Sequence, residues 1–185
     1  MLYLPFTTIA PVSPFFRELY VPKTLAMSME FRTLQPEDIP EIWRINEEGL
    51  PGTGKVSLDE IANLLDLSEF ALGAYDSSEL LGFVICLLPK KNYGSLNYAW
   101  FNQRYQQFLY VDRIAIAEHH RNKEIGSLLY EKVISKAKQL AIPVTAEVSL
   151  EPPNPGSMRF HFRNTFEEVG VQPIVPVGQS STVSL

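Results

Sequence analysis

The sequence predicts a single-domain α/β (α+β) fold, with helices packed around one sheet. Strand-like apolar runs and amphipathic helical segments are mixed along the chain, and helical spacing is clearest over residues 125–140. The chain has 185 residues, 45% of them hydrophobic, which is enough to bury one core. No internal repeat is visible, so we expect no second domain.

The elements follow from local patterns of apolar periodicity, capping residues and turn residues. Two capping boxes, Asp38 with Glu41 and Ser57 with Glu60, open the first two helices. The polar residues 76–79 separate two strand-like runs that form a hairpin. In chain order we expect a strand at 30–34, the two capped helices, a hairpin of 71–75 with 80–88, a long aromatic loop over 93–107, a strand at 108–117, a helix over 125–140, a strand at 144–150, a helix at 157–164, and a terminal hairpin of 166–174 with 182–185.

Residues 1–28 differ from the rest of the chain. Their apolar side chains are interrupted by Pro5, Pro11 and Pro14 and show neither strand nor helix periodicity. We therefore expect 1–28 to be a poorly ordered N-terminal extension and 29–185 to be the single domain. A chain that begins at Met27 would then melt at nearly the same temperature as the full chain.

Composition excludes several classes of protein. The net charge of −5 argues against a nucleic-acid partner, and no stretch approaches the ~20 apolar residues that cross a membrane. A single cysteine, Cys86, allows no internal disulfide and fits a cytoplasmic location. Residues 49–55 begin like a P-loop, but Val56 stands where magnesium needs a hydroxyl. His119, His120 and His161 lack ligand spacing, so we expect no metal.

A strand, a turn and a helix start follow one another between Val111 and Gly126. Backbone N–H groups of residues 121–126 would point from the helix N-terminus, where the macrodipole favours a pyrophosphate. Glu124 brings a negative charge to this turn, and Arg121 and Lys123 partly offset it.

This motif and a second one, from Asn154 to Phe166, resemble the GNAT superfamily of N-acetyltransferases over about residues 30–175. The first is similar to the family's Arg/Gln-x-x-Gly-x-Gly/Ala, with Glu124 replacing the first glycine. The second is similar to Asn-x-x-Ser/Ala-x-x-Phe-Tyr-x-x-x-Gly-Phe, with His161 replacing tyrosine and Thr165 replacing glycine. Residues 108–114 and 147–155 resemble an uncharacterised bacterial branch of predicted acetyltransferases still more closely.

The resemblance implies a mainly antiparallel sheet whose central strands splay apart to form an acetyl-CoA cleft. It implies an acetyl-CoA-dependent N-acetyltransferase that acts on a primary amine of a small molecule or of a peptide or protein. The strand at 108–117 would hold the pantetheine arm, and the N–H of Ile116 would face the thioester oxygen. The cofactor-binding residues so assigned are Ile114, Ala115, Ile116, Ala117, Arg121, Asn122, Lys123, Glu124, Ile125, Gly126, Ser127, Asn154 and Ser157.

The resemblance also places His161 where the family has a tyrosine proton donor, so His161 is a candidate acid. Asp112 is a candidate base if Tyr110, Asp112, Ile114 and Ile116 share one strand face; a salt bridge with a basic neighbour is an equal alternative for Asp112. Glu147 is a weaker candidate for the base.

The aromatic segment 93–107 is a candidate substrate wall, and the alternative is a hydrophobic cluster under a long loop. The candidate substrate residues are Tyr98, Trp100, Tyr110 and Glu147. Because Glu124 and His161 depart from the family pattern, a non-catalytic acyl-CoA-binding or regulatory module is the alternative function. A homodimer is common in the family.

Overall fold

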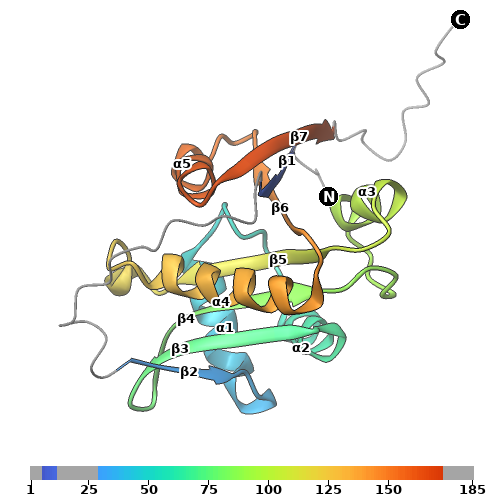
Figure 1. Cartoon of the computed structure of the whole chain (residues 1–185). Helices are drawn as coiled ribbons and strands as arrows, with labels where there is room; N and C mark the ends of the chain where they lie inside the picture. The colour runs from blue at the N-terminus through green and yellow to red at the C-terminus, as the bar shows by residue number, and fades with distance from the viewer. Residues whose placement is uncertain (1–5, 12–28, 173–185) are drawn as a thin grey trace, which may run out of the picture.

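The computed structural model describes residues 6–11 and 29–172. These residues form one seven-stranded sheet in the order β2-β3-β4-β5-β6-β1-β7 (Figure 1). Neighbouring strands run antiparallel except β5 and β6, which run parallel. The mixed, mainly antiparallel sheet is therefore confirmed. The strands are β1 Phe6–Pro11, β2 Met29–Thr33, β3 Phe70–Asp76, β4 Glu79–Leu87, β5 Leu109–Ile116, β6 Val144–Ser149 and β7 Phe166–Gln172.

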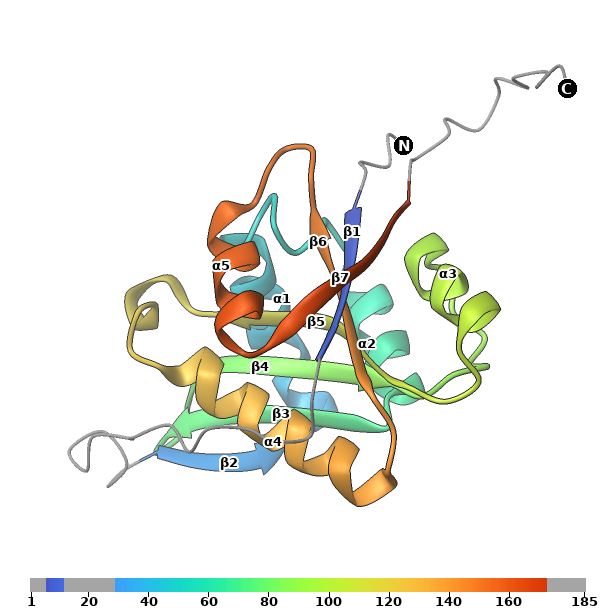
Figure 2. The same cartoon turned by 45° about the horizontal axis from the view of Figure 1, so that its top comes forward.

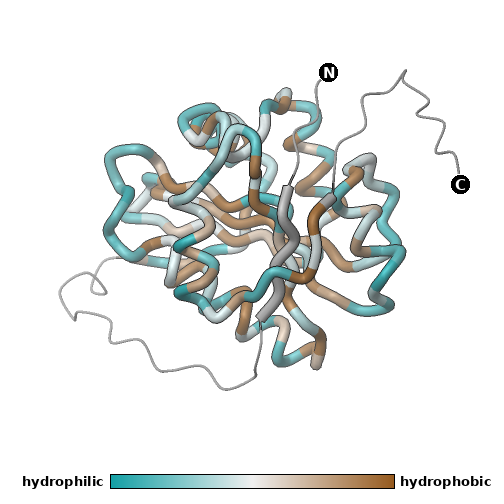
Figure 3. Tube along the Cα trace, turned by 90° about the horizontal axis from the view of Figure 1, so that it is seen from above, coloured by the Kyte–Doolittle hydropathy of each residue, from teal (hydrophilic) through white to brown (hydrophobic). Residues whose placement is uncertain are grey.

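Helices cover both faces of the sheet. The first two helices pack behind β3, β4 and β5, and α4 crosses the opposite face (Figure 1). A buried cluster fills each interface, and hydrophobic residues line the central strands while the peripheral loops are hydrophilic (Figure 3). None of the described helices is long and apolar enough to cross a membrane. The helices are α1 Ile39–Glu48, α2 Leu58–Leu67, α3 Leu96–Arg104, α4 Ile125–Leu140 and α5 Pro155–Arg163, with short 3-10 helices η1 Pro36–Asp38 and η2 Glu118–His120.

Of the two predicted capping boxes, the second is confirmed. Ser57 Oγ accepts from the Glu60 N–H at 3.2 Å, and Glu60 Oε2 accepts from the Ser57 N–H at 2.8 Å. The first lies one turn earlier than predicted, because Pro36 begins a 3-10 turn before α1. There Asp38 Oδ2 accepts from the Gln35 N–H at 2.8 Å.

The segment 93–107 is not a loop throughout, because it contains α3. Ser95 Oγ accepts from the Tyr98 N–H at 3.2 Å and caps the helix. Tyr98 and Phe101, three residues apart, are both buried in the cluster that faces α1 and α2. The prediction missed this helix because it treated the aromatic composition as a binding signal, whereas the spacing is that of a packed helix face.

Phe6–Pro11 lies inside the sheet, although the sequence analysis assigned the whole of 1–28 to an extension. β1 pairs with β6 through Phe6 and Ser149 and with β7 through Pro11 and Phe166 (Figure 2). Both partners come from the far end of the chain, so no local periodicity reveals this strand. The rest of the predicted extension, 1–5 and 12–28, lies outside the described residues, as does the 182–185 half of the predicted terminal hairpin.

We now expect removal of β1 to destabilise the protein. A chain that begins at Met27 would leave the edges of β6 and β7 without their backbone partners, so its melting temperature should fall by about 5 °C or more. A chain that begins at Phe6 is the matched control and should melt like the full chain. Equal melting temperatures for the two shortened chains in a calorimetric scan would show that β1 contributes nothing.

Candidate functional site

A cleft opens where β5 and β6 separate. The two strands pair only from Leu109–Val144 to Val111–Ala146, and beyond that point they diverge (Figure 2). The predicted splay of the central strands is confirmed. Two carboxylates stand at the fork, because Asp112 and Glu147 are the first residues of β5 and β6 beyond the last pair.

A β-bulge in β5 decides which side chains face this fork. Ile85 pairs with Arg113 and Cys86 with Val111, so Asp112 has no partner on β4. One extra residue reverses the alternation of side chains. Tyr110 therefore packs on the α1 and α2 side of the sheet, whereas Ile114 packs on the α4 side. The prediction that Tyr110, Asp112, Ile114 and Ile116 share one face of the strand is wrong.

The main chain of β5 presents alternate residues to the cleft. The Ala117 N–H donates to the Leu81 carbonyl at 2.9 Å, so the peptide groups of Ala115 and Ala117 face β4. Those of Ile114 and Ile116 face the gap. The predicted backbone contacts are thus available at Ile114 and Ile116, and not at the two alanines.

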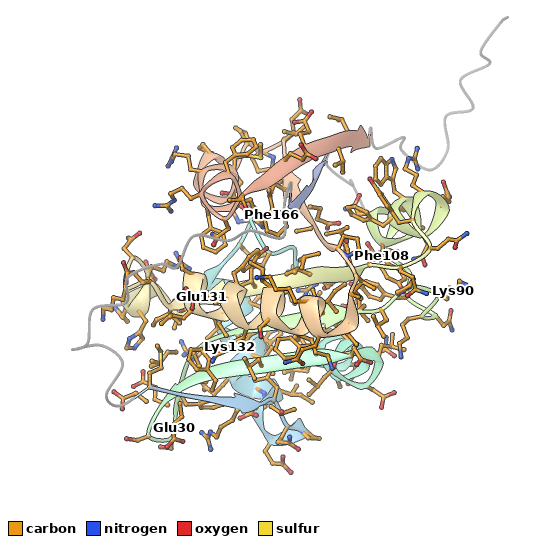
Figure 4. All side chains as sticks on the ribbon, viewed as in Figure 1. Glu30, Lys90, Phe108, Glu131, Lys132 and Phe166 are labelled. Carbon is orange, nitrogen blue, oxygen red and sulfur yellow. The ribbon has the colours of Figure 1, made fainter. Side chains whose placement is uncertain are left out.

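A cavity of about 940 Å³ lies between the end of β5, the start of α4 and α5. Glu131 of α4, labelled in Figure 4, also borders it. Gly52 and Thr53 of the α1–α2 loop close another side of the cavity. Ala117 and Lys123 do not line the cavity. The lining includes the other predicted cofactor residues: Ile114, Ala115, Ile116, Arg121, Asn122, Glu124, Ile125, Gly126, Ser127, Asn154 and Ser157.

The backbone keeps a glycine-like conformation at two positions where the glycine of the motif is replaced. Glu124 has φ 63° and Thr165 has φ 62°, in the left-handed region that costs a residue with a Cβ about 1–2 kcal/mol. Asn122, with φ 61°, tolerates this conformation better. The turn before α4 therefore keeps the shape that the motif predicts, with strain at Glu124.

Two of the predicted cofactor residues already have partners. Arg121 donates from Nε to the Ile116 carbonyl at 3.2 Å and from Nη2 to the Glu48 carbonyl at 2.5 Å. Its guanidinium therefore joins the end of α1 to the turn before α4. Asn154 Oδ1 accepts from the Ser157 N–H at 3.0 Å and caps α5.

A smaller cavity of about 200 Å³ lies at the fork, lined by both carboxylates. Glu147 is half-buried there, and Tyr110 Oη donates to Glu147 Oε2 at 2.5 Å. Burial raises the pKa of Glu147 to about 7; hydrogen bonds from Tyr110 and Asn97 oppose this rise and the charge of Asp112 adds to it. A carboxyl group with this pKa exchanges protons near neutral pH.

Asp112 forms a buried ion pair, the alternative that the sequence had left open. Arg113 Nε donates to Asp112 Oδ2 at 2.9 Å, and Arg113 Nη1 donates to Asn46 Oδ1 at 2.7 Å. The side chains of Arg113 and Asp112 are 8% and 4% exposed. Asn46 Nδ2 in turn donates to the Gly54 carbonyl at 3.0 Å, which ties the α1–α2 loop to the fork. Arg113 is the basic neighbour of that alternative, whereas no local pattern points to Asn46.

His161 borders both cavities, but its imidazole is buried and bonded on both sides. Nδ1 lies 2.8 Å from the Ser157 carbonyl, which can only accept, so Nδ1 carries the proton. Tyr130 Oη then donates to Nε2 at 2.5 Å. Burial lowers the pKa of His161 to about 4, against a smaller opposing effect of the bond to Ser157, so the ring is neutral at pH 7.

The aromatic residues predicted to form a substrate wall have structural contacts instead. Tyr98 Oη donates to the Leu88 carbonyl and accepts from the Lys91 N–H. Trp100 stacks under the guanidinium of Arg104 at 3.9 Å. Neither Tyr98 nor Trp100 lines either cavity, and Tyr110 reaches the site only through Glu147. Among residues 6–11 and 29–172, no three His, Cys, Asp or Glu side chains gather as metal ligands.

Known protein families and solved structures resemble this chain. The model of the acetyltransferase (GNAT) family matches residues 38–166. The structure is similar to Ard1 from Thermoplasma volcanium (TM-score 0.61, 17% identity, 75% of this chain and 82% of that one). It is similar to NAA60 from Arabidopsis thaliana in complex with acetyl-CoA (TM-score 0.59, 18% identity, 75% of this chain and 84% of that one). It is also similar to AAC(6')-Iy in complex with a bisubstrate analogue (TM-score 0.61, 14% identity, 82% of this chain and 99% of that one).

No curated protein matches the chain by sequence. The splayed strands, the turn before α4 and the cleft between them agree with the family match, which covers more than half of the chain. The chain therefore belongs to the acetyltransferase (GNAT) family, and acetyl-CoA is its acetyl donor.

Proposed function

We propose that this protein transfers the acetyl group of acetyl-CoA to a primary amine held at the fork between β5 and β6. The observation that carries the proposal is Glu147, a half-buried carboxyl group with its pKa raised to about 7, which lines the smaller cavity at the fork. This cavity adjoins the larger one, because both are lined by Gly52, Thr53, Ile114, Ser157 and His161. Donor and acceptor would thus approach each other from opposite sides of the junction.

The larger cavity suits the donor. Backbone N–H groups of residues 121–127 at the start of α4 would hold the pyrophosphate. The peptide groups of Ile114 and the N–H of Ile116 would bind the pantetheine arm as an added strand, which also fills the gap left where β6 diverges; the Ile116 carbonyl already accepts from Arg121. The thioester would then lie at the junction of the two cavities.

The smaller cavity suits the acceptor. An amine enters as an ammonium ion and must lose a proton before it attacks. Glu147 takes that proton, directly or through a water. The new C–N bond forms as the C–S bond breaks, and the Ile116 N–H donates to the carbonyl oxygen while it carries negative charge. Asp112 is occupied by Arg113, so Glu147 replaces it as the proposed base.

The role of His161 as proton donor to the leaving sulfur stays a prediction, with one change. His161→Ala should lower turnover about 10²-fold and leave acetyl-CoA affinity nearly intact, and His161→Tyr should recover part of the rate. Because the pKa of His161 is lowered to about 4, the ring is largely neutral at pH 7, and its protonated fraction falls further with each unit of pH above that. If this fraction limits turnover, the wild-type rate should show a descending limb between pH 6 and 9 that the His161→Ala variant lacks. An alanine variant with full turnover would leave His161 a purely structural role.

Glu124 offers a test of the donor site. Glu124→Gly should stabilise the protein by about 1 kcal/mol, since glycine adopts positive φ without strain, and should also tighten acetyl-CoA by removing a charge near the pyrophosphate. Glu124→Gln separates the two effects, because it removes only the charge. Thr165→Gly is a matched control that relieves similar strain away from the cavity lining. If Thr165→Gly raises the affinity for acetyl-CoA as much as Glu124→Gly does, the pyrophosphate does not bind at the turn before α4.

Turnover separates the proposed enzyme from the alternative of a non-catalytic acyl-CoA-binding module. Free CoA released from acetyl-CoA should rise when primary amines are added and should stay low without them. Binding of acetyl-CoA in calorimetry with no release for any amine would favour the module. The similar structures named above include a complex with acetyl-CoA and one with an aminoglycoside-derived bisubstrate analogue. A cytoplasmic location and a homodimer stay predictions.

A further inference from the structure

The charges around the smaller cavity carry an inference about the acceptor, and it rests on the proposed function. The cavity holds about 200 Å³, the room of about seven water molecules at ~30 Å³ each. Such a space takes a compact amine rather than a long chain. Its charged lining residues are Asp112, Glu147 and Arg113.

Arg113, the cationic residue of this lining, is not free to bind a ligand. Nε is bonded to Asp112 and Nη1 to Asn46, and its side chain is 8% exposed. The groups around it are acidic or neutral: Tyr93 approaches both Asp112 and Arg113, and Tyr110 and Asn97 are bonded to Glu147. A carboxylate on the ligand would therefore meet two carboxylates and no available guanidinium or ammonium group.

An ammonium group on the ligand would be attracted to the same lining. Glu147 is the lining carboxylate without a cationic partner, so an ammonium group would supply the missing counter-charge. The hydroxyls of Ser95 and Thr53 also line the cavity. Ser95 Oγ accepts from the Tyr98 N–H and can still donate. Thr53 Oγ1 donates to the Asn46 carbonyl and can still accept, so uncharged polar groups beside the amine have partners there. Shape and charge agree on the kind of molecule that fits.

We infer that the acceptor is a small primary amine that carries no carboxylate beside the amine, such as an amino-acid amide or an arylalkylamine. Free amino acids are excluded by charge, and not by size: their carboxylate would lie near Glu147 with no free cation to pair with, because Arg113 is bonded to Asp112, whereas a carboxylate and a carboxamide occupy nearly the same volume. The selection is thus electrostatic.

Matched pairs of ligands test this inference. With saturating acetyl-CoA, kcat/KM should be at least 100-fold higher for leucinamide than for leucine and for tyramine than for tyrosine. Calorimetric titration of the protein–CoA complex with the same four ligands should give the same order without any turnover. Equal kcat/KM within a pair would overturn the inference and leave the proposed transferase intact. A kcat/KM tenfold higher for a leucine-containing pentapeptide than for leucinamide would overturn the inference that the acceptor is a small molecule. If acetyl-CoA binds but none of the four ligands binds or reacts, the cavity is no acceptor site, and the proposed function fails with it.

A variant can be designed to reverse the selection. Thr53→Lys places an unpaired cation at the edge of the cavity, and Thr53→Met supplies similar bulk without charge. The lysine variant should raise kcat/KM for tyrosine relative to tyramine at least tenfold over the methionine variant. An identical ratio in the two variants would show that charge does not determine acceptor choice.

Discussion

Replacing Glu147 by glutamine is expected to lower turnover at least 10²-fold, because the amide cannot take the proton of the attacking ammonium ion. Acetyl-CoA affinity should stay unchanged, since Glu147 lines only the smaller cavity. The loss should therefore appear in kcat, measured with saturating acetyl-CoA, while calorimetry confirms cofactor binding. Asp112→Asn is the comparison, and if it abolishes turnover while Glu147→Gln does not, the base is Asp112.

The pH dependence follows from the raised pKa of Glu147. Only the ionised carboxylate accepts a proton, so the rate measured in the His161→Ala background, where no donor at position 161 titrates, should rise with pH through about 7 and level off above 8. Tyr110→Phe removes a hydrogen bond that favours the ionised form, and should move this rise to higher pH. Phenylalanine fits the aromatic cluster in which Tyr110 is buried. A rate in the His161→Ala background that is flat from pH 6 to 8 would contradict Glu147 as the base.

Replacing Arg113 by methionine is expected to destabilise the fold by about 3–5 kcal/mol, because Asp112 would remain buried without its counter-ion and Asn46 would lose a donor. For a chain of this size the melting temperature should fall on the order of 10 °C. Denaturant unfolding followed by circular dichroism measures both quantities.

A double variant separates the ion pair from packing. Asp112→Asn with Arg113→Met removes both charges and should recover most of the loss, since no unpaired charge is then buried. Asp112→Asn alone leaves Arg113 charged but bonded to Asn46. The free energy of unfolding of this single variant should lie between those of Arg113→Met and the double variant. If the double variant is as unstable as Arg113→Met, the cost comes from lost packing rather than from a buried charge.

The sequence predicted correctly those elements that depend on residues close together in the chain. The Ser57–Glu60 capping box, the β3–β4 hairpin and the long helix α4 stand close to where the sequence placed them. Most of the cofactor residues assigned from the two motifs also line the larger cavity. These predictions succeed because capping, turn chemistry and helical periodicity depend on neighbouring residues.

The sequence by itself therefore determined the fold class, the turn before α4 and the family. Only the tertiary structure decided the chemistry at the fork. The bulge at Asp112 reverses the side-chain alternation of β5 and depends on register with β4. The raised pKa of Glu147 comes from burial and from neighbours on other elements, and β1 enters the sheet between strands from the opposite end of the chain. Each of these features depends on residues far apart in the chain that folding brings into contact, and no local pattern encodes such contacts.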